Sequence, residues 1–490
     1  MDKQKGLLSR FSKPVDLTSG TPWRVILRYA APIIISYFLQ QIYVLTDAII
    51  CGQVLGSAEV AGVNDTFPLT FIFLQFAFGC TAGFSVITAG AVGRGDTSGV
   101  RRSFATQIYL SVGISALLTM LSLALLPRLL GIINVTEANP EVYRAAYDYC
   151  FVIFIGILAQ MGYNFVCGIL RAYGDSVTPL IFLVISTALN VVLDLVFLAV
   201  LGLGPTGAAA ATVLAQFISV IACTFYTFIK YRDLRLRAAD FKVSAKEIWE
   251  HLKQGVPLGL QFSVLAIGII VMQGAVVKFD LTASGAMVAG TPAQNGYGAA
   301  NKLINFLMAS YHGLGSAILG YNAQNYGKRD YARIKRGTLQ TLVIMLILFA
   351  ISLAVGLLFS INGTYQYIFM SADKVSVETI RFGNILIYVD ILFYAVLGFL
   401  IVVRSAVQGI SLPTYVLAAG IAELFARIAI CAYLPPLING APIDSGASSL
   451  AFAAVCFGDP GAWICASVIL SIPLIRYIIR QKYHHKTAQK

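Results

Sequence analysis

The stretch that decides the fold of this chain is the apolar run from Leu180 to Leu201, LIFLVISTALNVVLDLVFLAVL. A run of this length can cross the hydrocarbon core of a bilayer as one helix. It carries a single acid, Asp194, and an amide, Asn190, four residues earlier. Residues four apart share one face of a helix, so we expect the two side chains to lie together. An unpaired carboxylate in hydrocarbon is costly, and it therefore predicts a cavity where ions are handled.

The composition of the whole chain agrees with a membrane protein. Of its 490 residues, 58% are hydrophobic and only 12% are charged, and the mean hydropathy is +0.78. A soluble domain of this composition would have too few polar residues to cover its surface. We predict an all-α polytopic membrane protein with about twelve spans, at roughly 25–50, 66–90, 103–126, 148–169, 180–201, 207–229, 256–277, 298–322, 339–360, 384–403, 413–434 and 461–480.

The net charge of +12 is explained by topology rather than by nucleic-acid binding. With the N-terminus inside, most of the 35 Lys and Arg residues fall in inner segments. This asymmetry is the positive-inside rule, and it predicts a cell-membrane protein with both termini in the cytoplasm. Only six basic residues fall in the predicted outer segments, namely Arg128, Arg144, Lys278, Lys302, Lys374 and Arg381.

The two halves of the chain, on either side of a basic segment, contain similar sequence blocks at a constant offset. The block Gly93–Asp96 returns as Gly327–Asp330, and Gly79 and Gly313 precede the two blocks at the same offset. An even number of spans in each half gives parallel, pseudo-symmetric repeats around a central cavity, as in many secondary transporters. We predict a cytoplasmic tail at 1–22 and a first six-helix bundle at 23–229. A basic cytoplasmic linker at 230–255 joins it to a second six-helix bundle at 256–480, and a second cytoplasmic tail follows at 481–490.

A candidate ion site forms around Asp194. After a turn at Gly202–Gly204 comes the small-residue segment Gly207–Thr212, which can approach a neighbouring helix closely. A hairpin around that turn puts Asn190, Asp194 and Thr212 at compatible depths. Carboxylate, amide and hydroxyl oxygens suit a hard cation such as Na⁺, and a desolvated aspartate suits a proton. The alternative interpretation is that these groups only satisfy hydrogen bonds within their helices.

Other polar residues in the spans have two interpretations, cavity lining or hydrogen bonding between helices. Glu423 and Arg427 occupy the positions of Asn190 and Asp194 in the second half. We interpret them as an i,i+4 couple that neutralises itself on one helix. The candidate cavity-lining residues are Gln40, Gln160, Tyr163, Asn164, Asp390, Glu423 and Arg427.

The motifs of several enzyme classes are missing from the sequence. It contains no GxxxxGK[ST] phosphate loop, no HExxH, no GxSxG and no paired Cys/His cluster. We expect no enzymatic activity, no cofactor and no metal apart from Na⁺ at the candidate ion site, so that an ion gradient or passive flow would drive transport. The long outer segments 278–297 and 436–460 have no assigned role.

From about residue 20 to 480 the chain resembles the multidrug and toxic compound extrusion (MATE) transporters. The resemblance rests on motifs in a set order: Asp47–Gly52, Leu170–Asp175 with Pro179, Asn190 with Asp194, Gly207–Thr212, and the twin Gly-basic-x-Asp loops.

The resemblance implies two six-helix bundles around a central cavity and export of amphipathic organic cations in exchange for H⁺ or Na⁺. It also implies a cation site made by Asp47, Asn190, Asp194 and Thr212. Some members use an acid in span seven, and this chain has none between Val256 and Val277. The expected partners are small cationic substrates and the lipid bilayer, with no nucleic acid, and the expected state is a monomer.

Two rival functions are a lipid-linked saccharide flippase of the same superfamily and a membrane-embedded enzyme or receptor. The flippase would need several basic residues in the membrane to hold a diphosphate, and Arg427 is the one basic residue predicted inside a span. The missing nucleophile and metal motifs argue against the enzyme, and a missing signalling domain argues against the receptor.

Overall fold

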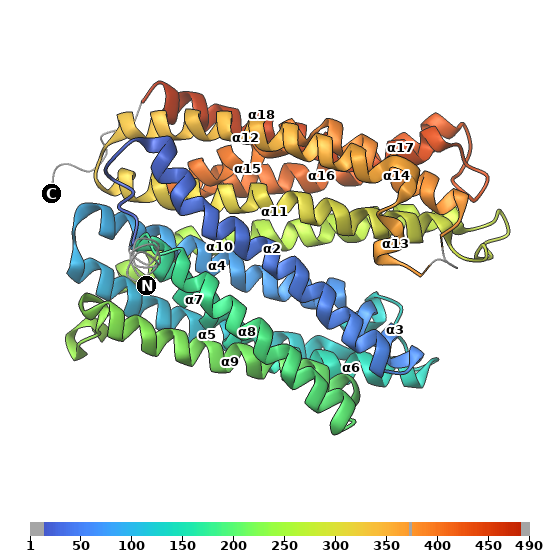
Figure 1. Ribbon diagram of the computed structural model, residues 1–490, viewed down its shortest axis with the longest axis horizontal. Coiled ribbons are helices and arrows are strands. Elements are labelled where there is room, and N and C mark those ends of the chain that lie inside the picture. The colour runs from blue at the N-terminus through green and yellow to red at the C-terminus, as the bar shows by residue number, and fades with distance from the viewer. Residues whose placement is uncertain (1–13, 372–374, 482–490) are drawn as a thin grey trace, which may run out of the picture. The chain divides into compact units, whose positions relative to one another are not determined.

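The computed structural model describes residues 14–371 and 375–481, which are almost entirely helical (Figure 1). The described part of the chain holds ten helices that are long and apolar enough to cross a membrane, and twelve when two bent pairs each count as one span. The pairs are α6 with α7 and α14 with α15, bent by 44° and 54°. The prediction of an all-helical chain with about twelve spans is confirmed.

The described residues divide into two compact units. The first comprises the chain up to Ser263 together with Leu319–Asp330 and Gln408–Pro413, and the second comprises Val264–Ile318, Tyr331–Val407 and the chain from Thr414 onward. The expected division into two bundles joined by a linker at 230–255 stays a prediction. Helix α10 begins at Ala245, inside that expected linker.

The helices of the first unit are separated by short turns. They are α2 (Pro22–Val54), α3 (Ser57–Asp65), α4 (Phe67–Arg94), α5 (Thr97–Ile132), α6 (Pro140–Ile155), α7 (Ile157–Ala172), α8 (Val177–Asp194), the π-helical turn η1 (Leu195–Val200), α9 (Gly204–Lys230), and the start of α10 (Ala245–Val277), with 3₁₀ turns η2 (Arg232–Leu234) and η3 (Ala238–Phe241).

The second unit contains the remaining helices. They are α11 (Pro292–Gly327), α12 (Tyr331–Ser360), α13 (Gln366–Phe369), α14 (Val377–Leu392), α15 (Tyr394–Gly409), α16 (Pro413–Asn439), α17 (Ser449–Cys456), α18 (Gly458–Pro473), the 3₁₀ turns η4 (Lys278–Asp280) and η5 (Ile361–Gly363), and the π-helical turn η7 (Leu474–Ile479). The C-terminal ends of α11 and α15 belong to the first unit.

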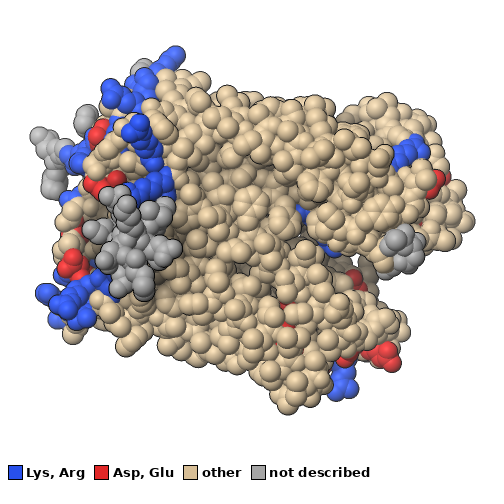
Figure 2. Space-filling view, viewed as in Figure 1, with Lys and Arg blue, Asp and Glu red and all other residues tan. Residues whose placement is uncertain are grey.

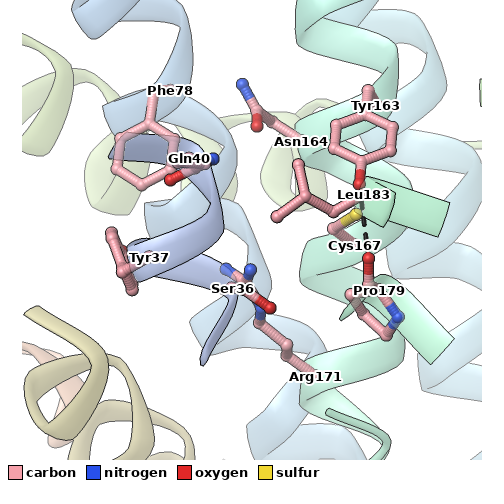
Figure 3. Close-up of a pocket in the computed structure, with 10 residues that line it drawn as sticks. All are labelled: Ser36, Tyr37, Gln40, Phe78, Tyr163, Asn164, Cys167, Arg171, Pro179 and Leu183. Carbon is pink, nitrogen blue, oxygen red and sulfur yellow. Dashed lines mark hydrogen bonds between the residues drawn. The ribbon is translucent and has the colours of Figure 1, made fainter. Parts of the chain in front are cut away.

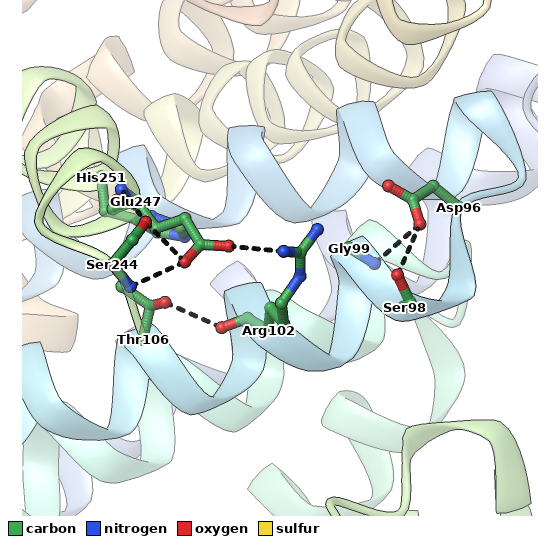
Figure 4. Close-up of polar contacts among 8 residues, drawn as sticks. All are labelled: Asp96, Ser98, Gly99, Arg102, Thr106, Ser244, Glu247 and His251. Carbon is green, nitrogen blue, oxygen red and sulfur yellow. Dashed lines mark hydrogen bonds and ion pairs between the residues drawn. The ribbon is translucent and has the colours of Figure 1, made fainter. Parts of the chain in front are cut away.

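Local sequence signals mark where several helices begin and end. Proline opens α2 at Pro22 and α6 at Pro140, where its missing N–H costs nothing. Gly95 ends α4 with a left-handed φ of 71°. Asp96 then caps α5 by accepting a hydrogen bond from Gly99 N at 2.8 Å (Figure 4). These signals give the α4–α5 connection a sharp, defined turn.

The two long outer segments contain helical turns and a helix cap. Within 278–297, the carboxylate of Asp280 accepts hydrogen bonds from Ala293 N and Gln294 N, both at 2.9 Å, and so caps the first turn of α11. Within 436–460, α16 continues to Asn439 and α17 begins at Ser449. The second segment is therefore mostly helical rather than a loop.

Most of the charged side chains visible in Figure 2 lie near the ends of the molecule. On the face drawn in Figure 2, Lys, Arg, Asp and Glu gather near the ends of the helices, whereas the flanks are almost free of them. Many large apolar residues are exposed, among them Met120, Phe225 and Val343. A surface of this kind suits contact with lipid tails.

Glycine lets α4 and the end of α11 cross at backbone contact inside the first unit. A methyl group added at Gly93 would lie 1.9 Å from Gln324 O, and one added at Gly327 would lie 2.1 Å from Gly90 O. Gly93 and Gly327 are equivalent positions of the sequence repeat, and Gly90 and Gln324 share the same offset. Each repeat therefore contributes the same two sequence positions to this helix crossing, so the contact is pseudo-twofold symmetric.

A polar network fastens α10 to α5 in the same unit. His251 Nδ1 lies 2.8 Å from Glu247 O, and its Nε2 lies 2.8 Å from Ser103 Oγ. A carbonyl only accepts, so Nδ1 carries the proton and Nε2 accepts from Ser103. Arg102 pairs with the Glu247 carboxylate at 3.4 Å (Figure 4). The network holds the start of α10 in one register.

The segment before α2 forms a short strap across the first unit. Val15 N donates to Gly174 O at 2.9 Å, and Asn325 Nδ2 donates to Leu17 O at 3.0 Å. Leu17 is fully buried, and Gly174 has a left-handed φ of 84° that brings its backbone against Val15. The strap therefore joins the α7–α8 turn to the end of α11.

Candidate functional site

Helix α8 carries the candidate ion site on its buried face. The buried residues of this helix include Phe182, Ser186, Asn190 and Asp194, which recur every four positions. Residues at this spacing form one stripe on a helix, so Asn190 and Asp194 point to the same side. The α-helix ends at Asp194 and continues as one π-helical turn. Such turns occur frequently at functional sites, since they widen the helix locally.

Helices α2 and α9 bring the other predicted residues to this face. Asn190 Nδ2 donates to Thr212 Oγ1 at 3.4 Å, and Tyr43 OH lies 3.3 Å from the same Thr212 oxygen. The carboxylates of Asp47 and Asp194 are close enough to interact electrostatically. The small buried residues Gly207 and Ala211 permit the close approach of α9. The structure thus brings Asp47, Asn190, Asp194 and Thr212 together.

The cluster is rich in oxygen atoms that accept and poor in groups that donate. Both Asp194 carboxylate oxygens, one Asp47 oxygen and the Asn190 amide oxygen are buried without a hydrogen-bond donor in the described part of the chain. No ion pair joins either aspartate to a described basic residue. Buried acceptors of this kind are costly unless a proton or a hard cation satisfies them. The arrangement suits reversible binding of a small cation.

Three of the four predicted lining residues in spans one and four do line a pocket. Gln40, Tyr163 and Asn164 face it from α2 and α7, and Figure 3 shows them with their neighbours. Gln160 is not among the lining residues. The other walls come from α2, α4, α7 and α8 through Ser36, Tyr37, Phe78, Cys167, Arg171, Pro179 and Leu183.

Asp390 lies in the second unit, apart from the residues above. It is buried, with one carboxylate oxygen that has no hydrogen-bond donor among the described residues. It interacts electrostatically with Asp459 and Arg427. The structure therefore places it in a second buried charge cluster, and no described pocket includes it.

The interpretation of Glu423 and Arg427 as a couple within one helix is wrong. Glu423 forms its ion pair with Arg404 of α15, and Arg427 forms its ion pair with Asp459 of α18. Each arginine therefore pairs with a carboxylate on a facing helix. That carboxylate can approach the guanidinium in better hydrogen-bond geometry than one four residues away on the same helix. Arg404 also lies within a candidate span, so Arg427 is not the one basic residue there.

An acidic group outside the spans fixes the turn between α7 and α8. Asp175 accepts hydrogen bonds from Thr178 Oγ1 and Tyr231 OH, both at 2.6 Å, and from Lys230 Nζ at 2.9 Å. Burial raises the pKa of Asp175, but hydrogen bonds from Thr178, Tyr231 and Lys230 outweigh burial and hold the pKa below its ordinary value. The turn that precedes the ion-site helix is therefore anchored to the end of α9.

Sequence reasoning joined neither Tyr43 nor Arg171 to the candidate ion site. Tyr43 lies one turn before Asp47 on α2, and that i,i+4 spacing is the signal that could have joined it to the cluster. Arg171 cannot be singled out from the sequence, because it lies at the end of a predicted span, where any arginine that sets topology could also lie.

Comparisons with known proteins agree on the fold and the family. The chain matches the family model described as MatE over residues 32–196 and 279–433. The probable multidrug resistance protein YpnP of Bacillus subtilis (strain 168) is 28% identical over 328 residues, which cover 66% of this chain and 69% of that protein. The FAD transporter of Shewanella oneidensis is 24% identical over 344 residues, which cover 68% of this chain and 71% of that protein.

A solved structure confirms the architecture over nearly the whole length. It is the outward-facing conformation of a multidrug resistance MATE family transporter of the MOP superfamily, with a TM-score of 0.82 and 21% sequence identity. The match covers 96% of this chain and 99% of that chain.

Proposed function

Because the chain belongs to the MatE family of membrane transporters, we propose that it exports amphipathic organic cations in exchange for H⁺ or Na⁺. Membership of a transporter family agrees with the expectation that the chain is not an enzyme. The name of its Bacillus subtilis relative, a probable multidrug resistance protein, supports drugs as substrates. Transport would proceed by alternating access, with the two halves of the chain exposing a shared cavity to each side in turn.

The observation that carries the coupling proposal is the set of buried, unsatisfied oxygens on α2 and α8. Asp47 and Asp194 would hold the coupling ion, while Asn190 and Thr212 supply neutral oxygens. Two neighbouring carboxylates repel each other when both are ionised, so one added proton or Na⁺ relieves the repulsion. When the ion leaves, the repulsion between the two carboxylates returns. This change in electrostatic energy would allow the site to bind and release one ion in each transport cycle.

The experiment is uptake of a fluorescent organic cation into proteoliposomes, with an imposed pH jump in Na⁺-free buffer or an imposed Na⁺ gradient at constant pH. The wild-type protein should respond to at least one gradient, and the responding arm identifies the ion. Asp194→Asn should lose the response, since an amide cannot bind a proton and carries no charge. FAD in a third arm tests whether the substrate of the Shewanella oneidensis relative is also carried.

A matched control removes an acid elsewhere in the same unit. Asp148 of α6 is 44% exposed and pairs with Arg144 at 3.8 Å, and it does not line the described pocket. Asp148→Asn should transport at the wild-type rate. If Asp194→Asn keeps the wild-type dependence on the gradient, the assignment of the coupling site is wrong.

The proposed setting is the cell membrane, with both termini in the cytoplasm and the protein acting as a monomer. The support for the orientation is the excess of Lys and Arg in one set of connecting segments, notably between α9 and α10. A reporter that is active only in the cytoplasm, fused after Lys490, should be active. An inactive fusion that still transports would overturn the orientation.

A further inference from the structure

Three charged side chains of the second unit form a cluster of two acids and one base. Arg427 of α16 pairs with Asp459 of α18 and interacts electrostatically with Asp390 of α14. Asp390 is buried, its Oδ1 has no hydrogen-bond donor, and it forms no ion pair in the described part of the chain. Glu423 adds no net charge, because it pairs with Arg404. One guanidinium therefore serves two carboxylates.

The fold leaves a place for this guanidinium against the backbone of α10. A methyl group added at Gly268 would lie 2.3 Å from Arg427 Nη1, so the guanidinium fills the space that a side chain on α10 would need. Nη2 donates to Asp459, whereas Nε and Nη1 are buried and have no acceptor among the described residues. Arg427 thus keeps donors that a second carboxylate can use.

The cluster repeats the charges of the proposed ion site, with one difference. Arg427 stands at the position of Asp194 in the sequence repeat, and α16 follows the bent pair α14–α15 as α8 follows α6–α7. In the first unit, Asp47 and Asp194 have no basic partner among the described residues. In the second unit, Asp390 and Asp459 have Arg427.

The net charges of the two groups make the parallel quantitative. Asp390, Asp459 and Arg427 together carry one negative charge when both acids are ionised. The two acids of the first unit reach the same charge only when one monovalent cation has bound. A buried carboxylate pair needs such compensation, because like charges repel strongly where water is excluded. The second unit therefore already contains the positive charge that the first unit must take up.

We propose that Arg427 is a built-in cation, which takes between Asp390 and Asp459 the place that a free cation takes in the first unit. A guanidinium stays protonated at every physiological pH, is weakly hydrated and suits buried ion pairs. Because it is covalently attached, it cannot exchange with the solution. The second unit then binds no free metal cation. The inference rests on the proposed ion site, to which it assigns the exchange of metal cations.

The test removes the built-in cation and asks whether a free cation replaces it. All proteins carry Asp194→Asn, so that Na⁺ cannot act through the complete first site. Thermal unfolding of the purified full-length protein in detergent at pH 8 is followed by tryptophan fluorescence, at constant ionic strength. Arg427→Ala should unfold at a lower temperature than its parent. Na⁺ or millimolar guanidinium, at roughly ten times its dissociation constant, should raise that midpoint by about 2–4 °C and leave the parent unchanged.

Three variants make the response specific. Arg427→Lys keeps a tethered cation and should show no response to Na⁺. Asp390→Asn added to Arg427→Ala leaves one acid and should abolish the response, because two carboxylates are needed to hold the ion. Arg404→Ala is the matched control, since it removes another arginine of the same unit but leaves only Glu423 behind. It should be destabilised without responding to Na⁺.

A second measurement does not need Arg427→Ala to fold. Binding of radioactive Na⁺ is measured on the Asp194→Asn protein with Arg427 intact. Saturable binding that disappears when Asp390→Asn is added overturns the proposal, because the second unit would then hold a free cation beside the guanidinium. Destabilisation of Arg427→Ala that neither cation relieves also overturns it, since a purely structural ion pair behaves in this way.

Failure of the proposed coupling site gives a different result. In that case Asp194→Asn keeps the wild-type dependence of transport on the gradient. The response of Arg427→Ala to Na⁺ still decides the role of Arg427, because it is measured without transport.

Discussion

Replacing Gly93 by alanine should destabilise the first unit, because the added methyl group has no room. It would lie 1.9 Å from Gln324 O, whereas ordinary contact begins at 3.4 Å, so α4 and α11 must separate by about 1.5 Å. Overpacking of this kind costs about 1–3 kcal/mol in the free energy of unfolding. Gly327→Ala, with its methyl group 2.1 Å from Gly90 O, should cost a similar amount. The measurement is unfolding of the purified protein in detergent, followed by tryptophan fluorescence.

The double variant provides the decisive comparison. One separation of the two helices relieves both clashes, so Gly93→Ala with Gly327→Ala should cost clearly less than the sum of the single changes. Gly113→Ala on α5 is the control, because nothing lies within 4 Å of its added methyl group. It should stabilise the helix by about 0.5–1 kcal/mol. If the loss in the free energy of unfolding of the double variant equals the sum of the two single losses, the two glycines do not share one helix crossing.

Three further changes test other contacts. Asp459→Asn leaves the Arg427 guanidinium, which is only 4% exposed, without its ion pair, and should lower the free energy of unfolding by about 3–5 kcal/mol in the same assay. Ser103→Ala removes the donor to buried His251 Nε2 and should cost about 1–3 kcal/mol. The pKa of Asp175 lies below its ordinary value of 3.8, so its stabilising contribution is complete above that pH and is lost as the pH falls further. Stability measured from neutral pH down to about pH 3 should therefore fall less steeply in Asp175→Asn than in wild type, and equal slopes would contradict this.

The candidate ion site was predictable because it depends on spacing along the chain. Asn190 and Asp194 are four residues apart on one helix, and Thr212 follows through a short turn marked by glycine. The helical spans were predictable for a similar reason, since each needs only a long apolar run. Asp47 came instead from the family resemblance, because nothing in its own span indicates which helix it faces.

The ion pairs of the second unit were not predictable, because they depend on which helices meet. Glu423 and Arg427 have ideal spacing for a pair on one helix, yet each has a partner on another helix. The spacing of residues along the chain predicts which side chains are neighbours on one helix, but it does not predict which side chains meet between helices. Arg171 was missed for the same reason, since its pocket is assembled from four helices.

The strap before α2 has a consequence for how the protein can be handled. Backbone hydrogen bonds at Val15 and Leu17 tie it to the α7–α8 turn and to the end of α11, which are distant in sequence. A truncated protein that begins at Pro22 would lack both hydrogen bonds and would expose the apolar site that buries Leu17. Affinity tags are better placed ahead of Pro14 or at the C-terminus. A spin label at the exposed Ser19, two residues after Leu17, would report whether the strap stays attached.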